Sequence, residues 1–220
     1  MISHRHKCIF IHVPKCAGSS IEKALGHFDL FEGRGAQDHR SIQDIKPSTG
    51  LSLVSRRNFR HLRHRYFKTH LNPANNYWVN RPQYEHYFKF TIIRNPWSRA
   101  YSYYRGVVRD ELNYTHRRMT PEMSFSDFAR KFCGKGNLKS QLAWLRDANG
   151  KLDLDFVGRF EHLQRDFGTI TENIGAKDVE LPHLLNSQDD SWRKAYDSDL
   201  IEFVRNAYRE EIEAFGYSFD

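Results

Sequence analysis

The sequence lacks the features typical of membrane-spanning, exported or disulfide-stabilised proteins. No window approaches about 18 consecutive apolar residues, so no membrane-spanning helix is predicted. The only apolar run near the N-terminus covers residues 8–13 and ends in Pro14-Lys15, which argues against a signal peptide. The three cysteines include no CxxC pair, which argues against a disulfide framework or a zinc knuckle. We therefore expect a reduced, cytoplasmic protein.

What the sequence does contain is enough apolar material for a core and an excess of positive charge. Of the 220 residues, 34 are Lys or Arg and 27 are Asp or Glu, which gives a formal net charge of +7, and 14% are aromatic. A disordered chain would have fewer aromatic residues and more net charge per residue. The length, without repeats or Pro/Gly/Ser-rich linkers, predicts a single domain over residues 1–220. The basic excess indicates an anionic partner without identifying it.

Short apolar runs alternate with segments of helical periodicity. Strands are predicted at 8–13, 66–71, 88–93 and 154–160, and helices at 21–25, 97–108, 125–132, 138–146, 161–174 and 198–215. This alternation is typical of an α/β fold with a mostly parallel sheet. Residues 29–64 are polar and give no clear assignment.

The segment between the first strand and the first helix has the composition of an anion-binding loop. It reads Pro14-Lys15-Cys16-Ala17-Gly18-Ser19-Ser20. A helix N-terminus presents unpaired N–H groups, and a glycine there lets the backbone approach a phosphate closely. Lys15 adds a point charge, although it precedes the glycine, unlike the lysine of GxxxxGK[ST] loops. An ordinary turn with a surface lysine is the alternative.

A second candidate anion site follows the strand at 88–93. Arg94 stands at the carboxyl end of this strand, where open α/β sheets bind ligands. Ser102 follows eight positions later in the predicted helix. A guanidinium and a hydroxyl suit one tetrahedral anion. An arginine that only caps the strand is the alternative.

Together the two segments resemble the sulfotransferases that use 3′-phosphoadenosine 5′-phosphosulfate (PAPS), closest to bacterial relatives of the carbohydrate (Golgi-type) sulfotransferases. Residues 156–161, 181–183 and 215–219 also resemble that group. The resemblance implies a P-loop-like, three-layer α/β fold with a mostly parallel central sheet flanked by helices. It also implies transfer of a sulfuryl group by in-line attack of an acceptor hydroxyl, on a glycan or other small molecule. No metal is required, because cationic groups bind the donor directly.

The resemblance assigns roles to individual residues. Lys15 assists the leaving group, and Arg94 and Ser102 bind the 3′-phosphate of the donor. The residues implied around the 5′-phosphate are Lys15, Cys16, Ala17, Gly18, Ser19 and Ser20. Arg193 and Lys194 are a looser match to a late basic contact with the 3′-phosphate, and a solvated loop is the alternative there.

The general base is expected among the twelve histidines. His70 is the first choice, because Lys68-Thr69-His70-Leu71-Asn72-Pro73 resembles the Lys-Thr-His-Leu-Pro segment that carries the base of soluble sulfotransferases. Lys68 is the accompanying charge. His39 is the second choice, because the adjacent Asp38 or another neighbour could orient it. A surface histidine without a catalytic role is the alternative for both.

Basic residues also gather beside the expected base. They are Arg56, Arg57, Arg60, Arg63, Arg65 and Lys68. We expect this cluster to recruit an anionic acceptor such as an acidic or sulfated glycan, with a solvated basic helix face as the alternative. His61 and His64 have helical spacing but no carboxylate or cysteine partner, so no metal site is predicted.

Two other classes of function remain open. One is a P-loop-like nucleotide kinase or phosphotransferase, against which the lysine position argues, as does the lack of an apolar strand ending in Asp for Mg²⁺. The other is a basic nucleic-acid-binding module, against which the lack of any nucleic-acid-binding signature argues. We therefore expect no nucleic-acid partner.

Overall fold

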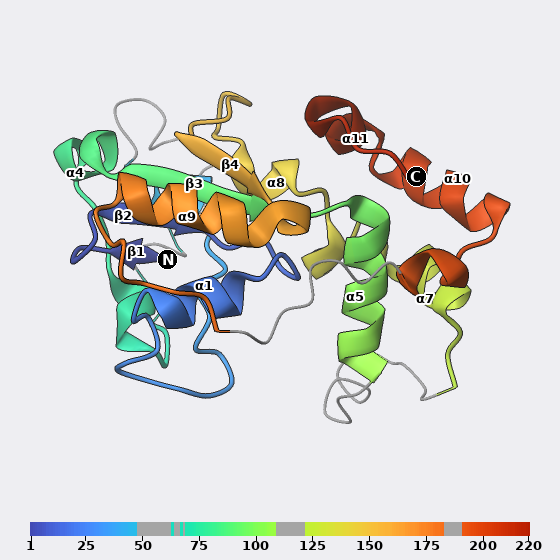
Figure 1. Cartoon of the computed structure of the whole chain (residues 1–220), viewed down its shortest axis with the longest axis horizontal. Helices are drawn as coiled ribbons and strands as arrows, with labels where there is room; N and C mark the ends of the chain where they lie inside the picture. Colours follow the sequence, from blue (N-terminus) through green and yellow to red (C-terminus); the bar gives the residue numbers. More distant parts are fainter. Residues whose placement is uncertain (48–62, 64–66, 68, 109–121, 183–190) are drawn as a thin grey trace. The chain divides into compact units, whose positions relative to one another are not determined.

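The computed structural model of the chain describes residues 1–47, 63, 67, 69–108, 122–182 and 191–220 (Figure 1). The residues group into two compact units, which are treated separately below. Unit 1 comprises Met1–Ile93 and Leu142–Leu185, and unit 2 comprises Arg94–Gln141 and Asn186–Asp220. The single domain over 1–220 stays a prediction.

Unit 1 is built on an open sheet of four strands. They are β1 (Ile2–Ser3), β2 (Cys8–Ile11), β3 (Phe88–Ile93) and β4 (Phe156–Arg159), in the spatial order β1-β2-β3-β4. β2 pairs with β3, and β3 with β4, in parallel, whereas β1 is antiparallel to β2. The mixed α/β class and the mostly parallel sheet are thus confirmed, and β3 has the predicted bounds.

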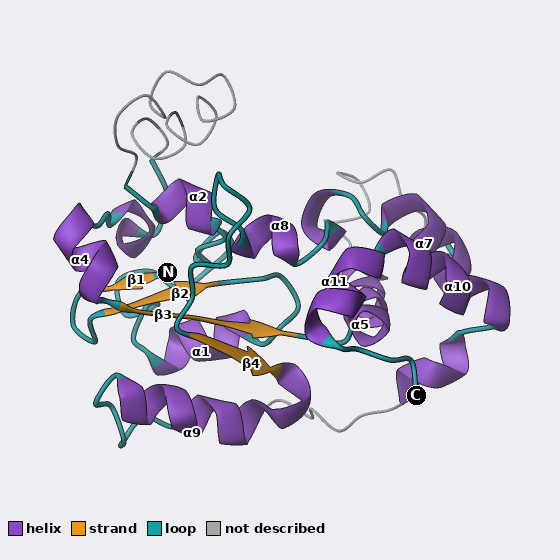
Figure 2. Cartoon of the chain, turned by 90° about the horizontal axis from the view of Figure 1, so that it is seen from above, coloured by secondary structure: helices purple, strands orange, loops and turns teal. Residues whose placement is uncertain are grey.

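The two central strands are buried because neighbouring elements cover both faces. All of β2 and nearly all of β3 are buried, and Phe10 stacks on Phe90 with ring centroids 5.1 Å apart. Continuous apolar runs of this kind are typical of parallel strands covered on both sides. Helix α9 (Leu163–Asn173) runs alongside β4 and β3 (Figures 1 and 2). Gly158 lies close to this helix, since a Cβ there would lie 3.1 Å from Cβ of Asp166 in α9.

The remaining helices of unit 1 are short. They are α1 (Gly18–Ala24), α2 (Ile42–Ile45), α4 (Arg81–His86) and α8 (Leu142–Leu145), with 3₁₀ turns η2 (Pro73–Asn76) and η4 (Phe160–His162). α1 begins three residues before the predicted start. The strand predicted at 66–71 is wrong: of its described residues, 67 is helical and 69–71 lie outside any strand. The polar side chain of Asn72 favours a turn here, because it accepts a hydrogen bond from the N–H of Ala74 at 3.0 Å.

Unit 2 is helical around an aromatic core. Its elements are α5 (Pro96–Val108), α7 (Phe125–Phe132), α10 (Ser198–Ala207) and α11 (Arg209–Phe215), with 3₁₀ turns η3 (Gly136–Leu138) and η5 (Ser191–Ala195). The long helix predicted at 198–215 is interrupted at Tyr208, whose buried hydroxyl donates to the carbonyl of Leu138 at 2.6 Å. Gly216 ends α11 with φ of 61°, the left-handed conformation in which glycine commonly ends helices. No helix in the described ranges is long and apolar enough to cross a membrane.

Candidate functional site

The loop between β2 and α1, residues 12–17, has a backbone that ordinary residues rarely adopt. Lys15 and Ala17 have φ of 71° and 65°, in the left-handed region that favours glycine. Each such residue costs about 1–3 kcal/mol and persists only where the surrounding structure requires it. We call Lys15–Ser20 the donor loop from here on. Its strained backbone marks the segment as a functional candidate.

The donor loop presents backbone N–H groups at the start of α1. The N–H groups of Ser20 and Ile21 donate to the carbonyl of Ala17 at 3.0 and 3.2 Å, and Ala17 caps the helix without a side-chain bond. Within the described residues, no hydrogen bond uses the N–H groups of Gly18 and Ser19. Two N–H groups beside a half-buried lysine suit a phosphate or sulfate.

The side chain of Cys16 points into the protein, so this residue contributes its backbone to the surface of the loop. Its side chain is 1% exposed, and Sγ lies 3.7 Å from the carbonyl oxygen of Pro14. The thiol therefore packs inward and fills the loop from beneath.

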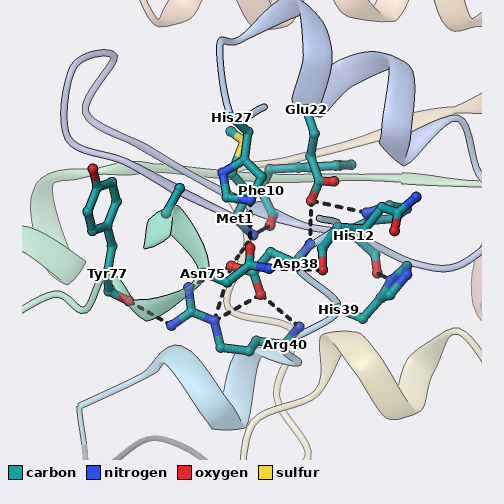
Figure 3. A network of polar contacts seen from close by, with 12 residues as sticks. Met1, Phe10, His12, Glu22, His27, Asp38, His39, Arg40, Asn75 and Tyr77 are labelled. Carbon is teal, nitrogen blue, oxygen red and sulfur yellow. Dashed lines mark hydrogen bonds and ion pairs between the residues drawn. The ribbon is translucent and has the colours of Figure 1, made fainter. Parts of the chain in front are cut away.

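Beneath the donor loop lies a buried network of polar side chains (Figure 3). Nδ1 of His12 lies 3.1 Å from Oε1 of Glu22, and both side chains are essentially inaccessible to solvent. The two atoms are within ion-pair distance without the alignment of a hydrogen bond. Burial lowers the pKa of His12 to about 3 and raises that of Glu22 to about 7. At neutral pH the His12 imidazole is therefore uncharged.

Asp38 and Arg40 form the charged part of the same network. Nε of Arg40 donates to Oδ1 of Asp38 at 2.9 Å, and its NH1 group donates to the carbonyl of Tyr77 at 2.6 Å (Figure 3). Burial opposes ionisation of Asp38, but the guanidinium outweighs it and holds the pKa of this carboxyl well below its usual range. Asp38 thus pairs with Arg40 and, at 3.2 Å, with the N-terminal amine of Met1, and a role of Asp38 or another neighbour in orienting His39 stays a prediction.

His39 lies against the strained loop from another side. Its ring centroid is 4.2 Å from that of His12, and Nδ1 faces the carbonyl oxygen of His12 at 3.5 Å. Crowding of the ring by neighbouring atoms, followed by the neighbouring His12, lowers the pKa of His39 to about 4, although the side chain keeps an exposed surface. An Nδ1 held toward a carbonyl leaves Nε2 on the opposite side of the ring.

His70 is half-buried in the turn that precedes η2. Its N–H donates to Oδ1 of Asn76 at 2.9 Å, and Nδ2 of Asn76 donates back to its carbonyl at 3.2 Å. The turn rather than a strand end therefore positions it. Lys68, the predicted accompanying charge, lies outside the described residues, as do Arg56, Arg57, Arg60 and Arg65 of the basic cluster, whereas Arg63 is described and exposed.

In unit 2, Arg94 is held at the point where β3 ends. Its N–H donates to Oε1 of Gln141 at 3.0 Å, and Nε2 of Gln141 donates to the carbonyl of Arg94 at 2.8 Å. Nε of the guanidinium donates to Oγ of Ser98 at 2.8 Å, one turn into α5. Ser102, the predicted partner, is half-buried one turn further along. The structure thus shows Ser98 in contact with Arg94, whereas the joint role of Arg94 and Ser102 stays a prediction.

A buried carboxylate supports this arrangement. Oε2 of Glu211 accepts from the N–H of Gln141 at 2.5 Å and from Oγ of Ser140 at 2.7 Å, and the side chain is fully buried. Neither Gln141 nor Glu211 was singled out from the sequence, because each is an ordinary polar residue in a mixed segment. What marks these two residues is the hydrogen bond between them, and only folding of the chain brings them together.

Arg193 and Lys194, the two basic residues near the C-terminus, lie in different environments. Nε of Arg193 donates to the carbonyl of Phe219 at 3.2 Å, and the guanidinium lies 4.5 Å from the centroid of the Trp192 ring. Arg193 is therefore engaged with the C-terminal segment. Lys194 is exposed. In the part of the chain that the structure describes, no group of three or more His, Cys, Asp or Glu could hold a metal ion.

Comparisons with known proteins agree with one family. The model described as "Sulfotransferase family" matches residues 1–218. Carbohydrate sulfotransferase 14 of Danio rerio is 20% identical over 234 aligned positions, which cover 92% of this chain and 54% of that protein. A protein of Archaeoglobus fulgidus named as uncharacterized is 26% identical over 127 residues, 53% of this chain and 91% of its own length. This chain thus spans about half the length of the named relative. No solved structure matches it.

Proposed function

The chain belongs to the sulfotransferase family, and from this premise we propose that it moves a sulfuryl group from PAPS to an acceptor hydroxyl. The observation that carries the proposal is the donor loop: a strained backbone at the carboxyl end of a buried parallel strand, with the N–H groups of Gly18 and Ser19 and the lysine beside them. In this reading the fold is P-loop-like, with helices in layers on either side of the sheet. The cytoplasmic location and a bacterial origin stay predictions.

The donor loop is proposed to bind the 5′-phosphosulfate. PAPS supplies the sulfuryl group and a stable phosphate leaving group. The N–H groups of Gly18 and Ser19 fit a phosphate oxygen, whereas that of Ser20 already donates to Ala17 and adds only its hydroxyl. Lys15 is proposed to neutralise the charge that develops on the bridging oxygen as the S–O bond breaks. Cys16 and Ala17 contribute the backbone shape of the loop, and no metal is invoked.

Residues of unit 2 are proposed to bind the 3′-phosphate. Ser98 holds Nε of Arg94, which fixes the plane of the guanidinium at the end of β3. A fixed planar guanidinium recognises phosphate better than a mobile one. Ser102 is proposed as a hydroxyl donor to the same group. Arg193 and Lys194 remain candidates for a further contact, although Arg193 is already bound to Phe219.

A histidine is proposed to take the proton of the acceptor hydroxyl during in-line attack. His70 is the first candidate because of the segment around it, and Lys68 is the proposed accompanying charge. His39 is the alternative, and a specific contact favours it: its ring packs on His12, next to the donor loop. With Nδ1 turned to a carbonyl, Nε2 of His39 is the nitrogen that would accept the proton.

The acceptor is proposed to be a carbohydrate hydroxyl, which the name of the Danio rerio relative suggests. An anionic glycan would suit the basic cluster at 56–68, and other small hydroxyl compounds remain outcomes of the same screen. Incubating the protein with labelled PAPS and a panel of neutral and sulfated glycans, phenols and alcohols identifies the acceptor.

The donor is tested by calorimetric titration with the product 3′-phosphoadenosine 5′-phosphate (PAP). We expect PAP to bind without Mg²⁺. Binding of ATP only with Mg²⁺ would instead favour the kinase. Binding of RNA with a steep salt dependence, and of no nucleotide, would favour the nucleic-acid-binding module.

A further inference from the structure

His12 supports the donor loop from beneath by direct ring contact. A Cβ added to Gly18 would lie 2.0 Å from Cδ2 and 2.1 Å from Nε2 of the His12 imidazole. Real Cβ atoms do not approach so closely, so the ring and the first residue of α1 fit only because position 18 is glycine. The backbone of the donor loop at Gly18 therefore packs directly against the imidazole of His12, and the ring determines the position of the loop.

The imidazole is itself held on three sides. Glu22, one turn into α1, lies 3.1 Å from Nδ1. Phe10 stacks on the ring with centroids 5.7 Å apart, and His39 covers another side at 4.2 Å. Oε1 of Glu22 also accepts from the N–H of Asp38 at 3.1 Å, which ties Glu22 to the neighbouring segment (Figure 3). Only 3% of the His12 side chain is exposed, so the ring is enclosed by these neighbours.

The strained backbone of the loop explains why a contact such as that with the His12 ring is needed. Lys15 and Ala17 both adopt left-handed backbone, and the cap residue Ala17 has no side-chain hydrogen bond to stabilise it. Such a conformation persists only where its surroundings enforce it. The ring beneath Gly18 is a contact of the required kind, because it blocks the loop from relaxing inward.

We propose that His12 is a positioning residue, whose imidazole holds the donor loop in the conformation that binds the donor. The inference rests on the proposed function, since that proposal assigns the loop to PAPS. His12 is uncharged at neutral pH and buried, so it acts on the loop by shape and not by attracting the donor's charge.

The test is a size-swap cycle measured by PAP binding. Gly18→Ala places a methyl group against the ring, and His12→Ala removes the ring; each is expected to weaken the Kd for PAP at least tenfold. The double variant His12→Ala/Gly18→Ala removes the clash, so it should bind PAP more tightly than Gly18→Ala alone. A double variant no better than Gly18→Ala, or a His12→Ala protein with the wild-type Kd, overturns the inference.

Controls separate positioning from loss of folded protein. A merely structural role lowers the fraction of competent protein, which calorimetry reports as reduced stoichiometry with an unchanged Kd. Ile170→Ala in α9 is the matched control: the side chain is fully buried in the same unit, and its loss should lower the melting temperature without changing the Kd.

Two further arms keep the outcomes distinct. If His12→Ala does not fold, His12→Asn replaces it, because Asn also removes the ring but leaves Glu22 a polar neighbour. Weaker PAP binding by this variant supports the inference, and a wild-type Kd overturns it. If the wild-type protein does not bind PAP at all, the proposed function fails and the inference with it. Wild-type binding with unaffected variants overturns the inference alone.

Discussion

The two candidate anion sites are built on opposite principles. In unit 1 the donor loop uses backbone: strained residues, two N–H groups and a glycine that rests on a buried ring. In unit 2 the site uses a side chain, the guanidinium of Arg94, whose Nε donates to Oγ of Ser98, while Gln141 bonds to the backbone N–H and carbonyl of Arg94. A loop that binds through its backbone N–H groups depends on the shape of the loop and is suited to the group of the donor that reacts. A fixed guanidinium depends on charge and is suited to recognition. We therefore expect substitution of the reacting side chains of unit 1, Lys15 and the base, to change turnover. Changes to the shape of the donor loop at His12 or Gly18 should weaken binding of the whole donor, and substitution of Arg94 in unit 2 should weaken recognition of its 3′-phosphate.

The largest effect is expected from the base. His70→Ala should lower kcat with PAPS by about 10²–10⁴-fold, because the acceptor hydroxyl loses its proton acceptor. The Kd for PAP should stay at the wild-type value. His86→Ala, an exposed histidine at the end of α4, is the control and should have full activity. Turnover near wild type would move the assignment to His39, whose alanine variant is then measured in the same assay.

Lys15→Ala should lower kcat by about 10²–10³-fold, because charge on the leaving group is no longer neutralised. Lys23→Ala serves as the control, since Lys23 lies on α1 with its side chain 60% exposed and its ammonium 3.3 Å from Oε1 of Glu32. Single-turnover kinetics with saturating PAPS isolates the chemical step. If Lys15→Ala changes only the Kd for PAP, the lysine binds the donor and does not assist departure.

Arg94→Gln sharpens the comparison from the other unit. The variant should bind PAP about 10–100-fold more weakly, through loss of a charge-assisted contact, while binding adenosine 5′-phosphate as wild type does. Arg105→Gln, an exposed arginine on α5, is the control. Calorimetric titrations with both nucleotides measure the difference. Equal losses for both nucleotides would contradict a contact specific to the 3′-phosphate.

Glu211→Ala tests the support behind Arg94. Removal of the buried carboxylate leaves the N–H of Gln141 and the hydroxyl of Ser140 without this acceptor, so the free energy of unfolding should fall by about 1–3 kcal/mol. Urea denaturation measures it, with the exposed Glu213→Ala on the same helix as the control. A stability equal to that of the control would show that the carboxylate contributes no net stabilisation.

The smallest effect is a pH dependence that belongs to unit 1. The pKa of Glu22 is raised from 4.5 to about 7, so its contribution to stability is present below pH 4.5 and is lost as the pH rises through 7. The pKa of His12 is lowered from 6.5 to about 3, so its contribution is present above pH 6.5 and is lost as the pH falls toward 3. Glu22→Gln should therefore remove most of the loss of stability between pH 5 and pH 8 and keep the acid-side loss. Urea denaturation at several pH values checks this, and an unchanged alkaline limb would contradict it.

Local patterns predicted the elements that depend on local chemistry. The apolar run at 88–93 became β3 with the predicted bounds, and 125–132 became α7. The strand predicted at 66–71 is wrong because the alternation of apolar and polar residues there is weak. The turn that Asn72 stabilises forms instead of a strand. The helix predicted at 138–146 instead gave η3 in unit 2 and α8 in unit 1, a division invisible in its periodicity.

For the site, the sequence by itself determined which residues stand at the carboxyl ends of β2 and β3, because apolar strands, glycine and proline act over a few positions. It thus predicted Lys15, Gly18 and Arg94 as candidate site residues, and the structure places them at these strand ends. Only the tertiary structure decided what holds them: Glu22 and His39 around His12, and Glu211 behind Gln141. Gln141 and Glu211 are 70 positions apart, and a polar residue becomes structurally decisive only when burial removes water and leaves it dependent on partners within the protein. That condition is a property of the folded chain.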